Sequence, residues 1–406
     1  MALDFFEGLR VLDLGQGVSG PFCAKMFSDL GAHVVKVEPP GGDLARSMGP
    51  FPDDTPHTEK SGIFLALNTN KLGITLNLEI AEGRALLLRL VEKADLVIEN
   101  FAPSHLPGLG LDFATLKSSN PELILTSITP FGQSGPWADF QANNLLISNL
   151  SGFSREHPGP VDDLASQPPL QLAAHQSDFI AGLTAAAATV TALNRRRQPG
   201  GGCHVDVSEM EVLSLLPQTG LTGHSQGNPP KGRHKSVAGI ESLRAILPCR
   251  DGYVSISPRQ EDQWERFVQM MGNPEWAQDP KFATRSGRVE NWFELEPLLA
   301  QWTSRQAKED VYRQAQAQHI PSFPLNNVAD LLGSPQFQAR EFFTESDHPV
   351  AGSLTYPGWP FQLASGKRVE LRPAPLLGQH NQAILGEAGL GLTPDQLQLL
   401  RAQEAI

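Results

Sequence analysis

The feature that most constrains the fold is an alternation, within the first 130 residues, between short apolar β-rich runs and longer helical stretches. The extended runs lie at 9–14, 33–38, 71–78, 95–100 and 123–132. Helical patterns separate them at 21–31 and 82–94. Strands that are apolar throughout are typical of sheets buried on both faces, and intervening helices are typical of parallel βαβ units. The pattern therefore predicts an α/β fold with a doubly wound parallel sheet.

The domain organisation follows from length and from breaks in composition. A chain of 406 residues is long enough to favour two domains. We predict a large domain over 1–216 that the C-terminal segment 345–406 completes, and a small domain with its return linker over 246–344. A Gly/Pro/Lys-rich stretch at 217–245 predicts a linker or mobile loop. Proline and aspartate at 154–172 predict a surface loop.

Composition narrows the possible partners. A net charge of −12 argues against nucleic acid, because phosphate backbones require a basic surface. No apolar run reaches the roughly 18–20 residues that span a bilayer, so we expect no membrane insertion. The N-terminus lacks a signal-peptide pattern, which indicates a cytoplasmic protein. Cys23, Cys203 and Cys249 are scattered, which predicts buried thiols and no metal site.

A dinucleotide-binding motif has to be considered. The glycines of residues 15–20 (GQGVSG) follow a strand and open a helix, and Glu38 ends the next strand. This matches the Rossmann fingerprint of an NAD-dependent oxidoreductase. However, Pro21 directly follows the third glycine, and a constrained turn (39–42, PPGG) follows Glu38. A tight strand-to-helix turn is the simpler interpretation.

Seven blocks occur in the order and spacing of a known enzyme family. They lie at 7–46, 67–78, 94–112, 120–136, 177–211, 320–341 and 374–390. In these blocks the chain resembles, from end to end, the family III CoA-transferases, which include formyl-CoA transferase and crotonobetainyl-CoA:carnitine CoA-transferase. The resemblance implies a Rossmann-like large domain, a smaller α+β domain and an interlocked-ring homodimer. It also implies transfer of CoA between carboxylic acids, with acyl-CoA as substrate and no tightly bound cofactor.

The resemblance places the family's catalytic aspartate at Asp178, in the SDFIAG block at the start of a helical segment. A carboxylate there can attack a thioester, form an acyl-aspartyl anhydride, and then become an aspartyl-CoA thioester that an acceptor acid resolves. Each step passes through an oxyanion that needs hydrogen-bond donors. We expect the helix start to help keep Asp178 ionised. The alternative is a plain N-cap.

The resemblance also assigns CoA contacts and a substrate-orienting residue. Asn144 stands where the family usually has an acidic residue, and it is either a substrate-orienting amide or a satisfied core amide. Without the family, Leu76 and Phe101 would be interpreted as core residues. The CoA contacts carried over are Val18, Ser19, Leu76, Asn100, Phe101 and Ala102.

Departures from the family bear on the substrate. Formyl-CoA transferase has basic residues where this chain has Pro39, Glu79, Gly108 and Gln141. Lys71 or Arg46 could replace them as phosphate contacts, or could form surface salt bridges. The segment 225–240 shows no glycine-rich lid, which argues against oxalate and formate. No bidentate arginine pattern is evident, which favours a monocarboxylic or hydrophobic acyl group.

Two other functions stay open. The α-methylacyl-CoA racemase branch of the fold uses a His–Asp pair, but Asn143 and Asn144 occupy the stretch where its histidine stands. His175 is near Asp178 in sequence, yet it need not face that carboxylate. The loss of the phosphate contacts also allows a non-catalytic CoA-binding paralogue.

Overall fold

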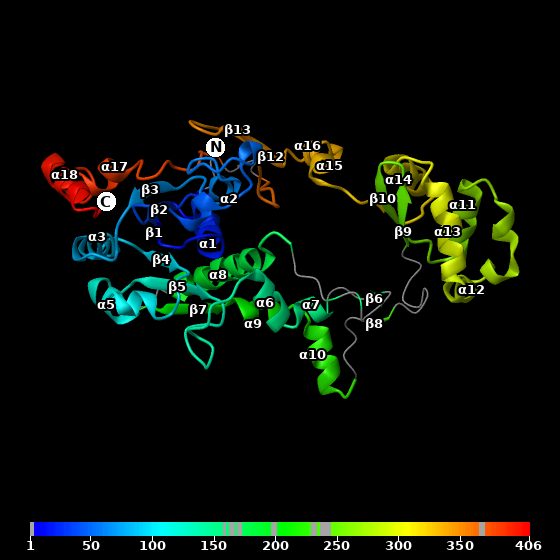
Figure 1. Ribbon diagram of the computed structural model, residues 1–406, viewed down its shortest axis with the longest axis horizontal. Coiled ribbons are helices and arrows are strands. Elements are labelled where there is room, and N and C mark those ends of the chain that lie inside the picture. The colour runs from blue at the N-terminus through cyan, green and yellow to red at the C-terminus, as the bar shows by residue number, and fades with distance from the viewer. Residues whose placement is uncertain are drawn as a thin grey trace. The chain divides into compact units, whose positions relative to one another are not determined.

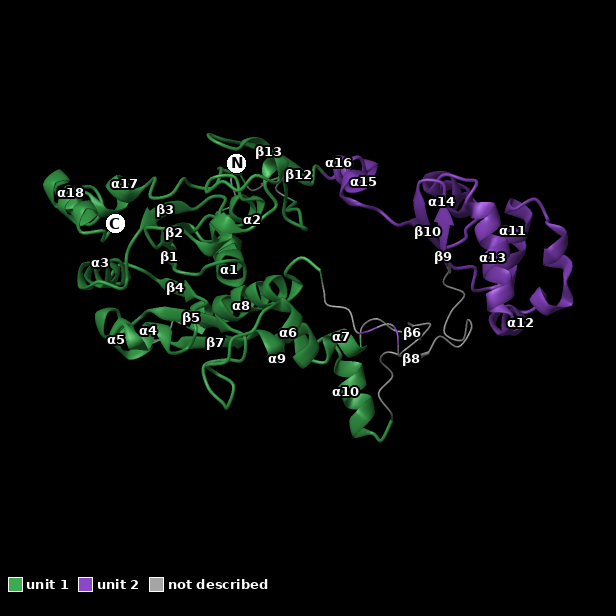
Figure 2. Cartoon of the chain, viewed as in Figure 1, with its two compact units in different colours: residues 1–158, 169–231, 341–406 green, residues 159–168, 232–340 purple. Residues whose placement is uncertain are grey.

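The computed structural model describes residues 4–156, 173–195, 201–228, 245–364 and 370–406, with short pieces at 160–161, 166, 168 and 234–235. The chain divides into two compact units (Figure 2). The first comprises residues 1–158, 169–231 and 341–406, and the second comprises 159–168 and 232–340.

The first unit is built on a six-stranded, entirely parallel sheet with the order β3-β2-β1-β4-β5-β7 (Figure 1). Its strands are β1 (Arg10–Asp13), β2 (His33–Glu38), β3 (Leu72–Thr75), β4 (Leu96–Glu99), β5 (Ile124–Thr129) and β7 (His204–Ser208). The prediction of an α/β fold with a parallel sheet is confirmed. The strand order reverses between β1 and β4, and ligands of open α/β sheets bind outside the carboxyl ends of strands at such a point.

Helices cover both faces of this sheet. On one face, side chains of α3 (Ala81–Val91), α5 (Phe113–Ser119), α17 (Asn381–Leu385) and α18 (Pro394–Ala402) form a core with the strands. On the other face, α1 (Ser19–Ser28), α8 (Gln176–Arg195) and α9 (Glu209–Ser214) form a second core. Successive strand residues serve opposite cores, as side-chain alternation requires.

Shorter elements complete the first unit. They are η1 (Leu44–Ser47), η2 (Pro52–Asp54), α2 (Gly62–Leu67), α4 (His105–Gly108), α6 (Asn144–Leu150), α7 (Phe153–Glu156), α10 (Gln218–Ser225) and the antiparallel pair β12 (Phe343–His348) and β13 (Gly352–Pro357). Helix α10 lies at the start of the segment 217–245 that the sequence predicts to be a linker or mobile loop. Gly220 of this helix leaves room for the Glu156 carboxylate close to the helix backbone. The remainder of 217–245 lies largely outside the described residues, as does most of 154–172.

The second unit has a three-stranded antiparallel sheet, β11-β10-β9, with helices around it. Its elements are β6 (Pro160–Val161), β8 (His234–Lys235), β9 (Ala245–Cys249), β10 (Gly252–Ile256), α11 (Glu261–Met270), η3 (Glu275–Gln278), η4 (Pro280–Phe282), α12 (Arg285–Glu290), α13 (Trp292–Thr303), α14 (Lys308–Ala317), β11 (Ser322–Pro324), α15 (Val328–Leu332) and α16 (Pro335–Ala339). Its own apolar core includes Trp264, Phe267 and Leu299.

The described residues show no helix that is long and apolar enough to cross a bilayer. Across the same residues, no group of three or more His, Cys, Asp or Glu side chains is placed to hold a metal ion. The three cysteines are free thiols, of which Cys23 is buried, whereas Cys203 and Cys249 are only half-buried. The prediction of three buried thiols is therefore correct for Cys23 alone.

Candidate active site

In the turn after β1, the backbone amides donate hydrogen bonds to side chains of the same chain. The N–H groups of Gly15, Gln16 and Gly17 donate, in that order, to Asp13 Oδ1 at 3.0 Å, Asn100 Oδ1 at 2.7 Å and Asp43 Oδ1 at 2.8 Å. A Rossmann fingerprint binds pyrophosphate through amides at this position. Because side chains occupy these amides, the motif is a structural turn, in agreement with the simpler interpretation of the sequence.

Asn100 fastens the end of β4 to this turn. Its side-chain Nδ2 donates to the Gln16 carbonyl at 2.8 Å and to Ser19 Oγ at 3.1 Å. Val18 and Ser19 are buried at the start of α1. The structure thus brings three of the predicted CoA contacts together at the point where the strand order reverses.

The other predicted CoA contacts, Phe101, Ala102 and Leu76, differ in their exposure and in their distance along the sheet from this turn. Phe101 is half-buried against the His105 ring, with 4.6 Å between the centroids, and Ala102 is exposed. Leu76 follows β3, which lies two strands from β1, and its side chain is 1% exposed within the core. At Leu76, only the backbone can reach a ligand.

Asp178 lies in the first turn of α8, and small residues set the path of that helix. Gly182 packs so closely against α1 that a Cβ there would lie 2.6 Å from the Ser19 carbonyl oxygen. In the same contact between α8 and α1, the rings of Phe179 and Phe22 pack edge to face, with 4.9 Å between their centroids. The helix start therefore lies beside the N-terminus of α1, and the Asp178 side chain keeps 24% of its surface exposed.

His175 faces Asp178, which the sequence had left open. Its Nδ1 lies 3.5 Å from Asp178 Oδ2. Ala174 and His175 have positive φ angles of 54° and 59°, a region uncommon for residues other than glycine, and these angles direct the chain into α8.

The surroundings of Asp178 shift its pKa upward. Burial raises the pKa of the Asp178 carboxyl, and this effect outweighs the lowering by the charge of His175 and by the backbone hydrogen bond. The backbone hydrogen bond at the helix start favours the ionised form, but burial has the larger effect on the pKa of Asp178. A carboxylate with a raised pKa is a stronger base and a better nucleophile.

Glu209 is a second buried acid in this region, and sequence reasoning missed it. It opens α9 and is 6% exposed. Burial and the charge of Asp178 raise the pKa of Glu209 to about 8, while the Ser19 hydroxyl donates a hydrogen bond to its carboxyl. In the sequence, Glu209 is simply a glutamate that follows the N-cap residue Ser208. Because most acids at the start of a helix are exposed to solvent, this position does not indicate a buried functional carboxyl. Asp178, Glu209, Ser19 and Asn100 form one polar cluster.

The Asn144 side chain accepts hydrogen bonds from Ser177, the residue that precedes Asp178. Its Oδ1 accepts hydrogen bonds from the Ser177 backbone N–H at 3.0 Å and from Ser177 Oγ at 2.7 Å. Asn144 lies in the first turn of α6, so it ties that helix to the start of α8. The amide oxygen thereby helps to fix the position of the N-terminal end of α8.

Lys71 and Arg46 do not replace the missing phosphate contacts, and they form no surface salt bridges either. Lys71 Nζ lies 2.8 Å from Asp13 Oδ2, and Arg46 Nε lies 2.6 Å from Glu38 Oε2. Both side chains are about 3% exposed or less. Burial lowers the pKa of Lys71 to about 8, although Asp13 opposes the shift. The cations belong to an internal charge network beneath the turn and cannot meet a ligand.

A partly exposed acid and a buried acid near the switch point of a doubly wound sheet are typical of α/β enzymes with a ligand site at the carboxyl edge of the sheet. The model of CoA-transferase family III matches residues 6–381. The chain belongs to this family.

The relatives cover nearly the whole chain. The chain is 33% identical to the succinyl-CoA–D-citramalate CoA-transferase of Chloroflexus aurantiacus, over 98% of each chain. It is 31% identical to the succinate–glutarate CoA-transferase of Agrobacterium fabrum, over 94% of this chain and 95% of the relative. The crystal structure of a CAIB/BAIF family protein from Brucella suis matches with a TM-score of 0.83 and 31% identity, over 94% of this chain and 98% of that one. This protein is therefore an enzyme, a CoA-transferase.

Proposed function

We propose that the enzyme moves CoA between two carboxylic acids through covalent intermediates on Asp178. The observation that carries this proposal is a partly exposed carboxyl with a raised pKa at the start of α8, next to the switch point of the sheet. Nucleophiles are commonly tuned in this way by burial. The relatives support the class of reaction, since their names pair succinate with a second acid.

The steps balance without water or ATP. The Asp178 carboxylate attacks the carbonyl of the donor thioester, and the C–S bond of the tetrahedral adduct breaks, which releases CoA as a thiolate and leaves an acyl-aspartyl anhydride. The thiolate attacks the aspartyl carbonyl, which releases the donor acid and forms an aspartyl-CoA thioester. The acceptor carboxylate attacks this thioester, again expelling the thiolate. The thiolate then takes the new acyl group, and the Asp178 carboxylate is restored.

We propose that CoA binds along the carboxyl edge of the sheet, at the residues carried over from the family. Main-chain groups of Val18 and Leu76, whose side chains are buried, and the half-buried Phe101 ring would contact it. The orienting role of Asn144 is indirect in this proposal, because its amide oxygen is bonded to Ser177.

An interlocked homodimer is part of the same proposal. Helices that pack on one another in the first unit carry large apolar side chains that are 42–57% exposed. They are Leu145, Leu146 and Leu150 of α6, Leu183 and Val190 of α8, and Leu215 and Leu216 at the end of α9. Such a concentration of exposed apolar side chains is typical of protein–protein contact.

The test is CoA transfer from succinyl-CoA to a panel of monocarboxylic and dicarboxylic acids, followed by chromatography. We expect Asp178→Asn to lose at least about a thousandfold in kcat/KM, because it removes the nucleophile. Asp139→Asn, which changes an exposed aspartate, is the matched control and should keep wild-type activity. Full transfer by Asp178→Asn would overturn the proposal.

One observation favours a second candidate, proton exchange at the α-carbon. His175 and Asp178 form the type of acid–base pair that such chemistry uses. Incubation of 2-methylacyl-CoA with the enzyme in D₂O separates the two functions. Deuterium at the α-carbon without CoA transfer would identify an isomerase, and transfer without deuterium supports the proposal.

A further inference from the structure

The carboxyl edge of the six-stranded sheet carries few basic side chains. Within ten residues of the end of each strand, all of them described, lie Arg46 after β2, Arg84 after β3 and His105 after β4, and no other Lys, Arg or His. Arg46 is buried and paired with Glu38 and Glu59, so it cannot meet a ligand. Arg84 and His105 are half-buried, and each keeps surface that a ligand can reach.

Arg84 lies in the first turn of α3, beside one of the predicted CoA contacts. Its Nη1 donates to the Leu78 carbonyl at 3.0 Å, and Leu78 follows Leu76 by two residues. The loop packs tightly on this turn, since a Cβ at Gly83 would lie 1.9 Å from the Asn77 carbonyl oxygen. Within the described residues the guanidinium has no acidic partner. Its other N–H groups are therefore available to a phosphate, which arginine binds through paired hydrogen bonds.

His105 lies at the same edge of the sheet, after β4. Its backbone N–H donates to the Ala102 carbonyl at 2.9 Å, and its ring packs on the Phe101 ring. Both of these partners are predicted CoA contacts. Neither ring nitrogen of His105 has a hydrogen-bond partner in the described part of the chain. An imidazole has an N–H donor in either charge state, so His105 can donate to a phosphate oxygen.

Both residues lie on the sheet face opposite to the core that supports Asp178. Helices α3 and α4 pack into one core with the strands, whereas α1 and α8 pack into the other. The thiol of CoA has to reach Asp178, while the predicted contacts at Ser19 and Asn100 lie at the carboxyl edge, where a ligand can cross between the faces. Strands β3 and β4 are three strand intervals apart, or about 14 Å. A nucleotide with its phosphates can extend along that edge, so this end of CoA belongs beside Arg84 and His105.

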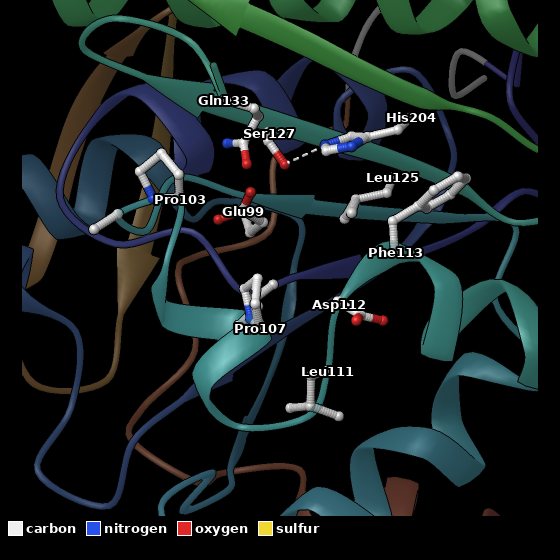
Figure 3. Close-up of a pocket in the computed structure, with 12 residues that line it drawn as sticks. Glu99, Pro103, Pro107, Leu111, Asp112, Phe113, Leu125, Ser127, Gln133 and His204 are labelled. Atoms are coloured by element: carbon white, nitrogen blue, oxygen red, sulfur yellow. Dashed lines mark hydrogen bonds between the residues drawn. The ribbon is translucent and has the colours of Figure 1, made fainter. Parts of the chain in front are cut away.

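The cavity beside α4 does not suit a phosphate. It has a volume of about 230 Å³ and is lined by residues of α4 and by Glu99 of β4 (Figure 3). Among the described residues no lysine or arginine lines it, and burial lowers the pKa of His204 on its wall. A phosphate there would lose its hydration without gaining a counter-charge. We therefore expect the phosphates outside this cavity, where His105 and Arg84 supply donors.

We propose that Arg84 and His105 bind the phosphate groups at the nucleotide end of CoA, in place of the basic residues that formyl-CoA transferase has at other positions. The proposal rests on the function proposed above, because it takes CoA as the substrate, but it does not depend on which residue is the nucleophile. Glu79 and Glu82 are exposed on the same loop and turn as Arg84, so their charge repels phosphate and the guanidinium has to offset it. Removal of this cation should therefore weaken CoA binding sharply.

The test compares succinyl-CoA with the succinyl thioester of pantetheine, which keeps the thiol arm and lacks all phosphates. We expect Arg84→Gln to lose about tenfold in kcat/KM with succinyl-CoA, because a charge-assisted hydrogen bond is lost, and less than about twofold with the pantetheine thioester. His105→Phe keeps the ring on Phe101 and removes the donors, so it should lose about threefold with succinyl-CoA alone. Arg84→Lys keeps the charge and should recover most of the loss. Arg10→Gln, which changes an exposed arginine at the amino edge of the same sheet, is the matched control and should behave like wild type.

Calorimetry of CoA binding in the Asp178→Asn background separates this proposal from the one for Asp178. There the loss of CoA affinity in Arg84→Gln and His105→Phe should persist, whichever residue carries the acyl group. With Asp178 in place, KM for succinyl-CoA should rise while kcat stays within about twofold, since neither side chain touches the reacting atoms. Arg84→Met replaces the glutamine variant if that protein does not fold, with the same expected loss. The proposal is overturned if either variant binds CoA like wild type, or if the two thioesters lose kcat/KM equally.

Discussion

At the scale of single residues, the site combines two acids that cannot both ionise without cost. The Asp178 side chain is 24% exposed, Glu209 is buried near it, and like charges in such a position raise the pKa of at least one carboxyl. Glu209, with a pKa of about 8, is the neutral member at pH 7. The Ser19 hydroxyl links it to Asn100 and hence to the turn after β1.

This pair predicts a pH dependence. Above about pH 8, Glu209 ionises beside Asp178 and repels the anionic thiolate and acceptor acid, so kcat/KM of the wild type should fall. Glu209→Gln stays neutral, so its kcat/KM should remain level to about pH 10 and differ less than about threefold from wild type at pH 7. An unchanged alkaline limb in Glu209→Gln would contradict this role.

The pH dependence of the free energy of unfolding tests the raised pKa of Glu209 independently of activity. A carboxyl whose pKa is raised in the folded state stabilises the protein most at low pH, and that contribution is lost as pH rises from about 4.5 through about 8. The free energy of unfolding of Glu209→Gln should therefore exceed that of wild type increasingly over this window, by on the order of a few kcal/mol at pH 8. Urea titrations at several pH values provide the measurement.

At the scale of elements, the sheet was predictable because its signal is local. The run 33–38 is strand β2 without change, since Val34, Val35 and Val37 give it an apolar β-branched character. The end of one helix and the orientation of one side chain depend on positive backbone φ angles, which the pattern of apolar residues does not indicate. The C-terminal segment forms two helices, α17 and α18, because Gly391 takes a φ of +84° between them. The orientation of His175 depends on left-handed backbone angles.

The candidate site was predictable only through the resemblance to a family. Local sequence favoured an N-cap at Asp178, and nothing local distinguished Glu209 from a surface acid. Gly182 brings α8 against α1, and this contact joins residues 19 and 182. Packing over such a separation sets which acids are buried, and burial is what raises their pKa values.

At the scale of the whole molecule, the exposed leucines of α6, α8 and α9 predict self-association. In sedimentation at micromolar concentration, we expect wild type at twice the 44.0 kDa chain mass. Leu183→Glu should reduce the dimer fraction or the yield of folded protein, because Leu183 is 55% exposed on α8. Leu399→Glu, at a 58% exposed position on α18, is the matched control and should stay dimeric. A monomeric wild type would rule out the assembly.

The central claim is that Asp178 carries CoA covalently, and mass spectrometry of the intact chain and its peptides tests it most directly. After incubation with succinyl-CoA and rapid quenching, we expect a CoA adduct on the peptide that contains Asp178, labile to hydroxylamine and missing from Asp178→Asn. A CoA adduct on another peptide, or one of equal yield in Asp178→Asn, would contradict the account.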